Sequence, residues 1–149
     1  MATALSPRLV AGANRLQDVF LDPGERDLLI DWDAVTEGIV ASFRQSIGTG
    51  LDDQRSIDLV GQLSLASPRF RHLWGRHDIG GRNGTVMRLR HPLLGELRLN
   101  REKLIVGEAQ NLTMAIYHAD PGTEDAGKLA LLTSSTATTT QDTAASSRR

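Results

Sequence analysis

The stretch TVMRLRHPLLGELRLN, residues 85–100, decides the fold. Within it Met87 and Leu89 alternate with arginines, and beyond Pro92 the residue Leu97 alternates with charged neighbours. Alternation with period two is typical of a strand with one buried face, and a proline interrupts a strand because it has no N–H to donate. We therefore predict two strands with a break between them.

A third alternating segment follows at residues 112–117, where Leu112, Met114 and Ile116 alternate with smaller or polar residues. Three strands with one apolar face each predict an antiparallel sheet with one wet side. We expect these three side chains to lie on the buried face. The turn signal at residues 120–122 predicts the end of the sheet, and residues 126–132 are expected to form a last helical turn or two.

The first half of the chain has helical spacing instead. We predict helices over residues 14–20, 32–47 and 53–65, and a short helix begins after Ser67, with Pro68 at its first position. Asp31 is the expected N-cap of the second helix, and Asp52 or Asp53 that of the third. The third helix is expected to bury Ile57, Val60, Leu63 and Leu65. The motif Asp22-Pro23-Gly24 indicates a turn.

Helices followed by an antiparallel sheet predict an α+β fold with the helices packed on one face of the sheet. The length of 149 residues fits about one domain, and an apolar content of 40% suffices for a core. We expect the domain to span residues 1–132. From Thr133 to the end, ten of seventeen residues are Ser or Thr, which predicts a disordered tail.

Composition excludes several classes of protein. There is no cysteine, which rules out disulfides and thiol catalysis, and the net charge of −1 rules out nucleic-acid binding by bulk positive charge. No apolar run reaches about 18 residues, and no signal peptide is recognisable at Met1, so we expect a cytoplasmic protein without a membrane span.

The charges are unevenly distributed along the chain. Residues 18–58 hold ten acids and three arginines, whereas residues 69–90 hold six arginines and one acid. Two interpretations stay open. Either the two stretches face each other in the fold, or the basic stretch binds an anion such as a phosphate or a ligand carboxylate.

Catalytic and DNA-reading motifs are not recognisable. His72, His77, Asp78 and His91 have no helical metal-ligand spacing, no serine lies in a G-x-S-x-G turn, and the segment Gly80–Gly84 lacks the lysine of a phosphate loop. No two helices have helix-turn-helix spacing. We expect no enzyme activity, no cofactor, no metal and no direct DNA contact, although a small hydrolase or metal enzyme stays a third hypothesis.

What remains is a set of apolar side chains with room for an adaptable cavity between helices and sheet. Arg90 or His91 could hold a polar head group there. The candidate ligand-binding residues are Trp32, Phe43, Leu63, Phe70, Trp74, Met87, Leu89, Arg90, His91, Leu97, Met114 and Ile116.

The order of several short motifs resembles one family. These motifs are Phe20-Leu21-Asp22-Pro23, Asp31-Trp32, Phe43-Arg44, Leu59-Val60-Gly61-Gln62-Leu63, Ser67, Phe70, Leu73-Trp74, Arg76-His77-Asp78-Ile79, Arg90-His91-Pro92 and Leu94-Gly95-Glu96-Leu97. In this order, over Val10 to Thr123, they resemble the MmyB-like ligand-binding domain. In that family the domain is the effector-sensing half of XRE-type helix-turn-helix regulators, most abundant in actinobacteria.

The resemblance implies a PAS-like fold with a cavity that takes a lipid-like or fatty-acid-like molecule. The family carries a DNA-binding domain and a further strand upstream, where this sequence has only Met1 to Pro7. It also often has a lysine near Met87, so an anion-binding role there would pass to Arg88 or Arg90. The main hypothesis is thus a sensor domain of a transcriptional regulator. The alternative is an interaction module with a vestigial cavity that forms a homodimer or pairs with a full-length helix-turn-helix regulator.

Overall fold

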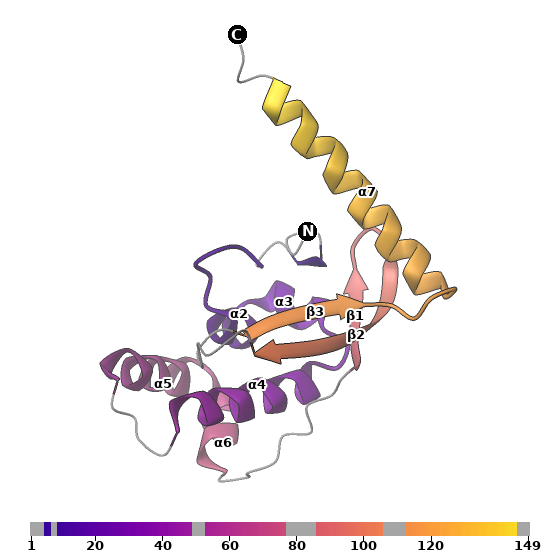
Figure 1. Ribbon diagram of the computed structural model, residues 1–149. Coiled ribbons are helices and arrows are strands. Elements are labelled where there is room, and N and C mark those ends of the chain that lie inside the picture. Colours follow the sequence, from indigo (N-terminus) through magenta and orange to yellow (C-terminus); the bar gives the residue numbers. More distant parts are fainter. Residues whose placement is uncertain (1–4, 7–8, 49–52, 77–85, 106–112, 146–149) are drawn as a thin grey trace.

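A computed structural model shows a layer of helices packed against one face of a three-stranded sheet (Figure 1). It describes residues 5, 6, 9–48, 53–76, 86–105 and 113–145. The elements are α2 (Arg15–Leu21), α3 (Pro23–Leu28), α4 (Trp32–Ile47), α5 (Gln54–Ala66), α6 (Pro68–Gly75), β1 (Val86–His91), β2 (Gly95–Ile105), β3 (Thr113–His118) and α7 (Glu124–Ala145). The predicted α+β class and antiparallel sheet are confirmed.

Side-chain caps begin most of the helices. Asn14 accepts hydrogen bonds from the first turn of α2, Asp53 caps α5, and Ser67 caps α6 ahead of Pro68. These caps satisfy N–H groups that have no partner inside the helix. Asp31 precedes α4 as predicted, but its side chain makes no capping hydrogen bond.

One helix was not predicted. The segment expected to be only a turn also begins α3, because Asp22 ends α2 and its carboxylate accepts the N–H of Gly24 at 2.7 Å. Pro23 occupies the first position of α3, where a missing N–H costs nothing. A residue that ends one helix and caps the next leaves no room for a loop between them.

The sheet has the order β1-β2-β3, with antiparallel pairing throughout. Met87 pairs with Leu99 and Leu89 with Leu97, and all four side chains are buried against the helices. Leu29, between α3 and α4, forms an isolated antiparallel β-bridge with Leu89 of β1. The helical layer is therefore joined to the sheet through backbone pairing as well as through packing.

Two apolar clusters form the core. The first joins the sheet to α2, α3 and α7, with Leu89, Leu97 and Leu99 at its centre. The second lies among the helices and is centred on Leu63 and Phe70. The expected stripe on α5 is wrong in part, since Leu65 is 86% exposed and Ile57 is 42% exposed. The helix packs through the side that carries Leu59, Val60 and Leu63.

The last helix, α7, is longer than expected. It contributes Leu132 to the first core cluster and then leaves the body of the protein (Figure 1). It runs to Ala145, into the Ser/Thr-rich segment predicted to be disordered. Thr133 and Ser134 donate hydroxyl hydrogen bonds to the carbonyls of Ala130 and Leu131, three residues back in the helix.

Candidate functional site

A cleft of about 400 Å³ opens beside Trp32 in the helical layer. It lies where the α2–α3 junction, the start of α4 and the α5–α6 junction come together. This volume is within the range of about 300–1,000 Å³ that is usual for small-molecule sites. Its lining residues are Val19, Phe20, Leu21, Asp22, Pro23, Arg26, Trp32, Ala66, Ser67, Pro68 and Arg69.

The indole of Trp32 is held from two sides. Its Nε1 donates a hydrogen bond of 2.9 Å to the carbonyl of Val19, and its ring meets Phe20 edge-on at a centroid distance of 6.4 Å. Because Trp32 is the first residue of α4, its ring reaches back over α2. The indole therefore forms a fixed apolar wall of the cleft.

Two guanidinium groups approach this ring. The guanidinium carbon of Arg26, on α3, lies 4.8 Å from the ring centroid, and that of Arg69, on α6, lies 6.0 Å away. Cations over an indole face are attracted by its quadrupole. The cleft thus combines an aromatic wall with two positive charges.

The two arginines differ in their partners. Arg69 donates to the carbonyl of Asp33 at 3.1 Å and forms ion pairs with the carboxylates of Asp33 and Glu37 at 3.5 and 3.3 Å. Arg26 is exposed and forms no ion pair with a carboxylate in the described part of the chain. Arg26 is therefore the cation that could receive an anionic group in the cleft.

Of the twelve residues predicted for the ligand site, only Trp32 lines this cleft. Four others form the helical cluster, in which Leu63 and Phe70 are fully buried. The Trp74 ring stacks on Phe70 at 5.7 Å and lies 5.8 Å from Phe43. These side chains pack against one another, so they form core and not a cavity wall.

The space expected between helices and sheet is filled over β1 and the first half of β2. Met87, Leu89 and Leu97 pack there with Val19, Leu28 and Leu99, and the three sheet leucines are at most 2% exposed. The prediction of an open hollow above these strands is therefore wrong for this part of the sheet.

The two residues proposed to hold a polar head group do not meet there. Arg90 is exposed on the outer face of the sheet, opposite Glu96. His91 is 5% exposed, and its Nδ1 accepts the N–H of Leu93 at 3.2 Å in the turn between β1 and β2. The first is turned away from the helices, and the second is buried at the end of β1.

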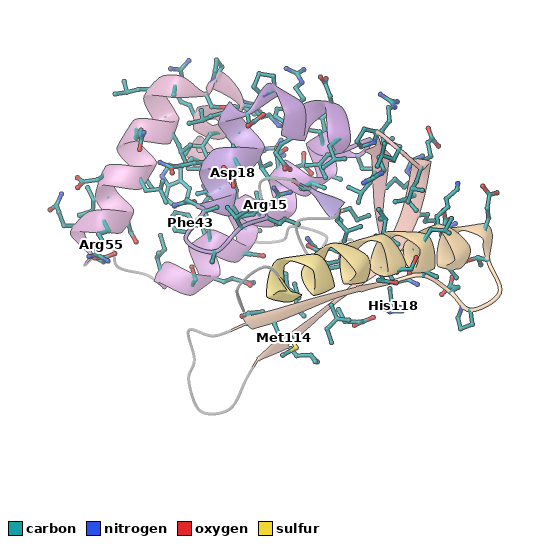
Figure 2. All side chains as sticks on the ribbon, turned by 90° about the horizontal axis from the view of Figure 1, so that it is seen from above. Arg15, Asp18, Phe43, Arg55, Met114 and His118 are labelled. Carbon is teal, nitrogen blue, oxygen red and sulfur yellow. The ribbon has the colours of Figure 1, made fainter. Side chains whose placement is uncertain are left out.

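Met114 and Ile116 were assigned to the wrong face of β3. They pair with Leu104 and Glu102 of β2, and they are 51% and 40% exposed. Figure 2 shows Met114 directed away from the helical layer. The register places Tyr117 on the inner face instead, where it packs against the first core cluster. Leu112 lies outside the described residues.

Sequence reasoning missed most of the cleft, above all Arg26 and Arg69. The signal that could have found them is the pair of helix starts, Asp22-Pro23 and Ser67-Pro68. Each places an arginine within the first four residues of a short helix. Which sides of these helices meet depends on packing and is not written in either motif.

The basic and acidic stretches of the sequence do face each other at two points. Arg69 pairs with Asp33 and Glu37, and Arg88 pairs with Asp31. Hydrogen bonds from Arg88 hold the pKa of Asp31 below its usual value, while partial desolvation acts in the opposite direction. Arg88 is thus occupied by an internal carboxylate.

Among the residues described, no three histidines and acids form a group that could hold a metal ion. His72 is exposed on α6, whereas His77, Asp78 and the glycine-rich segment 80–84 lie outside the described residues. Within the same part of the chain, no helix is both long and apolar enough to cross a membrane.

A model of one protein family, the MmyB-like transcription regulator ligand binding domain, matches residues 1–132. This family consists of ligand-binding domains of transcription regulators, which suggests a non-enzymatic role. Since the match covers most of the chain, the protein belongs to this family, as the order of its motifs predicts. Comparisons with curated proteins and with solved structures found no match.

Proposed function

We propose that this chain is the effector-sensing domain of an XRE-type regulator in the cytoplasm, and that it binds a small lipid-like or fatty-acid-like molecule. One observation carries the proposal: the cleft joins an apolar wall to the guanidinium of Arg26, which forms no ion pair with any carboxylate among the described residues. Family membership supports a ligand-binding role, and the cleft supplies a place for an amphiphile.

The apolar part of the ligand would lie against Val19, Phe20 and Trp32, with burial worth about 25 cal/mol per Å² of apolar surface. A carboxylate head would bind Arg26, which can offer two parallel N–H donors. Such a ligand has to displace the guanidinium from its contact with the indole. Arg69 would remain with its own carboxylates and contribute positive potential.

Binding at the cleft would also affect the position of the N-terminal segment at Ser6. Arg26 and Glu25 are consecutive residues of α3, and they point in different directions: Arg26 is exposed, whereas Glu25 is buried and accepts a hydrogen bond from Ser6. A ligand that shifts α3 would thereby shift the segment at Ser6. A ligand shifts an equilibrium between two arrangements only through its different affinity for them, so the ligand would have to bind one position of α3 more tightly than another.

The test is binding of fatty acids of increasing chain length to the purified full chain, followed by thermal shift and by isothermal titration. Denatured protein is also extracted, and the extract is analysed for amphiphiles by mass spectrometry. We expect a co-purifying amphiphile, and we expect Arg26→Gln to weaken carboxylate binding about tenfold, equivalent to loss of one charge-assisted hydrogen bond.

The matched control is Arg98→Gln, which removes an exposed arginine from the outer face of β2, away from the cleft. It should leave affinity unchanged. An empty extract, together with no thermal shift from any fatty acid, would refute the lipid-like ligand. Equal loss of affinity in both variants would refute the role of Arg26.

A further inference from the structure

Within the described part of the chain, β3 forms one edge of the sheet, because the order β1-β2-β3 gives it β2 as its single neighbour. Residues Thr113–Ile116 are all exposed. Edge strands are usually protected by charged side chains, proline or bulges, since their free N–H and C=O groups invite pairing. The stretch Thr113–Tyr117 contains no charged residue and no proline.

The outer face of the sheet at this edge is apolar. Leu104, Met114 and Ile116 are 49%, 51% and 40% exposed. Leu104 pairs directly with Met114, and Ile116 is two residues further along the same face of β3. They form one continuous group, which we call the outer apolar stripe. Together, an unprotected edge and an adjacent apolar group indicate an interaction surface.

We propose that a second copy of this chain pairs with β3 in antiparallel orientation, about a two-fold axis at Ala115, so that the two sheets become one continuous sheet. This goes beyond the proposed function and does not depend on it. In this register Ala115 lies opposite its own copy, and Met114 lies opposite Ile116 of the second copy. Paired residues of an antiparallel sheet share a face, so the two outer apolar stripes join.

The strand is complementary to a second copy of itself, because apolar or neutral residues lie opposite each other and like charges stay apart. On the inner face the row across the joined sheets would be Lys103, Ala115, Ala115 and Lys103. The two lysines are then three strand spacings apart, about 14 Å. This exceeds the Debye length of about 8 Å at physiological salt, so they hardly repel each other.

The outer rows also oppose no like charges. Each outer row runs from Glu102 through Ile116 to Met114 and Leu104 of the other copy. Each row therefore contains one Glu102, and the two Glu102 residues lie at opposite ends of the two rows. Glu102 has His118 beside it at 3.9 Å in its own copy. The neutral strand can therefore pair with itself. Three apolar side chains per copy make a small interface, so we expect a weak dimer that forms with rising concentration.

Sedimentation equilibrium of the full chain over a wide concentration range is the first measurement. We expect a monomer–dimer equilibrium, and we expect Ile116→Lys to raise the dissociation constant at least about tenfold, because it places a charge in the joined stripe. Leu65→Lys is the matched control, since it makes the same change at a residue of α5 that is 86% exposed. It should leave the equilibrium unchanged.

Disulfide trapping tests the register independently of the lysine variant. The chain has no cysteine, so Ala115→Cys introduces a single thiol at the proposed axis. We expect it to form a covalent dimer on mild oxidation, whereas Thr113→Cys should not, because that residue would face Tyr117 of the other copy. Circular dichroism confirms that each variant is folded.

Three results would overturn the proposal. One is a wild-type chain that stays monomeric at every concentration. Another is a dimer that Ile116→Lys leaves intact, which would place the interface elsewhere. The third is cross-linking of Thr113→Cys in preference to Ala115→Cys, which would mean a different register or a different occupant of the edge.

Discussion

Arg88 binds the carboxylate of Asp31 through two hydrogen bonds, of which the one from Nε to Oδ2 is 2.8 Å long. The pair joins β1 to the residue that precedes α4. Close to it the N–H of Ile30 donates to the carbonyl of Arg88 at 3.1 Å. Asp31 was predicted to cap α4, but its side chain instead holds the helical layer against the sheet through Arg88.

The Asp31→Asn variant should be less stable than wild type at neutral pH. This difference in the free energy of unfolding should disappear in acid. The folded state holds the pKa of Asp31 below its ordinary value, so its contribution to stability is present above the unfolded pKa of about 4 and is lost as pH falls below it. Urea unfolding of wild type and Asp31→Asn at several pH values measures this. The difference should be largest at pH 7 and should vanish in strong acid.

The control for this prediction is Asp58→Asn, an exposed carboxylate on α5 that accepts a hydrogen bond from Gln54. It should show a smaller difference at pH 7. If the difference between wild type and Asp31→Asn stayed constant from pH 7 into strong acid, the ion pair with Arg88 would not be its cause.

Arg44 closes the end of α6, and its removal should destabilise the protein by about 2 kcal/mol. Its guanidinium donates to the carbonyls of Leu73, Trp74 and Arg76 and lies 4.8 Å over the Trp74 ring. Each hydrogen bond from this partly exposed guanidinium contributes about 1 kcal/mol net, and the cation–π contact about 0.5–1 kcal/mol, less the water contacts that the carbonyls regain on removal.

The variants for this prediction are Arg44→Lys and Arg44→Ala, measured by urea unfolding. A lysine has no planar fork, so it should recover only part of the lost stability. Arg55→Ala, at an exposed position on α5, is the control and should change stability by less than about 0.5 kcal/mol. Full recovery by lysine would show that charge alone, and not the fan of carbonyl acceptors, is what matters.

A Leu→Ala substitution should lower the free energy of unfolding by very different amounts on the two faces of β2. Leu99 is fully buried, so Leu99→Ala should cost about 2–5 kcal/mol through lost burial and a cavity. Leu104 is 49% exposed on the outer face, so Leu104→Ala should cost less than about 0.5 kcal/mol. Unfolding is followed at low protein concentration, where the chain is expected to be monomeric. Equal costs would mean that Leu104 is covered.

The same two residues show how far the sequence could lead. Alternation identified Met87, Leu89 and Leu97 as inner residues, because Leu89 and Leu97 each stand between two charged residues and Met87 lies two positions before Leu89. Beyond Leu99 the inner positions become Arg101 and Lys103, while Leu104 points outward. Hydrophobicity alone therefore misplaced Met114 and Ile116, since only the pairing register shows that the apolar side of β3 is its outer one.

The cleft was harder to predict for a different reason. Asp22 and Ser67, which cap the helices beside the cleft, are local signals, and the start of a helix after Ser67 was predicted. The meeting of Arg26 with the Trp32 ring depends instead on how α3 packs beside α4, which no short-range pattern encodes. The sequence could predict class, most elements and family, but it could not predict which side chains remain at the surface to bind a ligand.

Glu25 should be the most sensitive charged residue of the protein. Its side chain is 1% exposed, its Oε2 lies 2.6 Å from Nη1 of Arg15, and its other oxygen accepts a hydrogen bond from Ser6. Figure 2 shows Arg15 close to Asp18, and the Arg15 side chain is 32% exposed. Glu25→Gln would leave the arginine without its counter-charge. Removing one partner of a buried pair costs about 3–5 kcal/mol, and because water can partly solvate the 32% exposed Arg15 we expect a loss near the lower end, about 2–3 kcal/mol.

Ser6→Ala removes the hydroxyl that donates to Glu25 and should cost about 1 kcal/mol. Asp27→Asn, at an exposed residue of the same helix, controls for a change of charge on α3. The double variant Ser6→Ala with Glu25→Gln should cost less than the sum of the two, because both changes act on the same contact. Strict additivity in urea unfolding would show that Ser6 and Glu25 do not interact, and it would remove the route by which a ligand at Arg26 could affect the N-terminal segment.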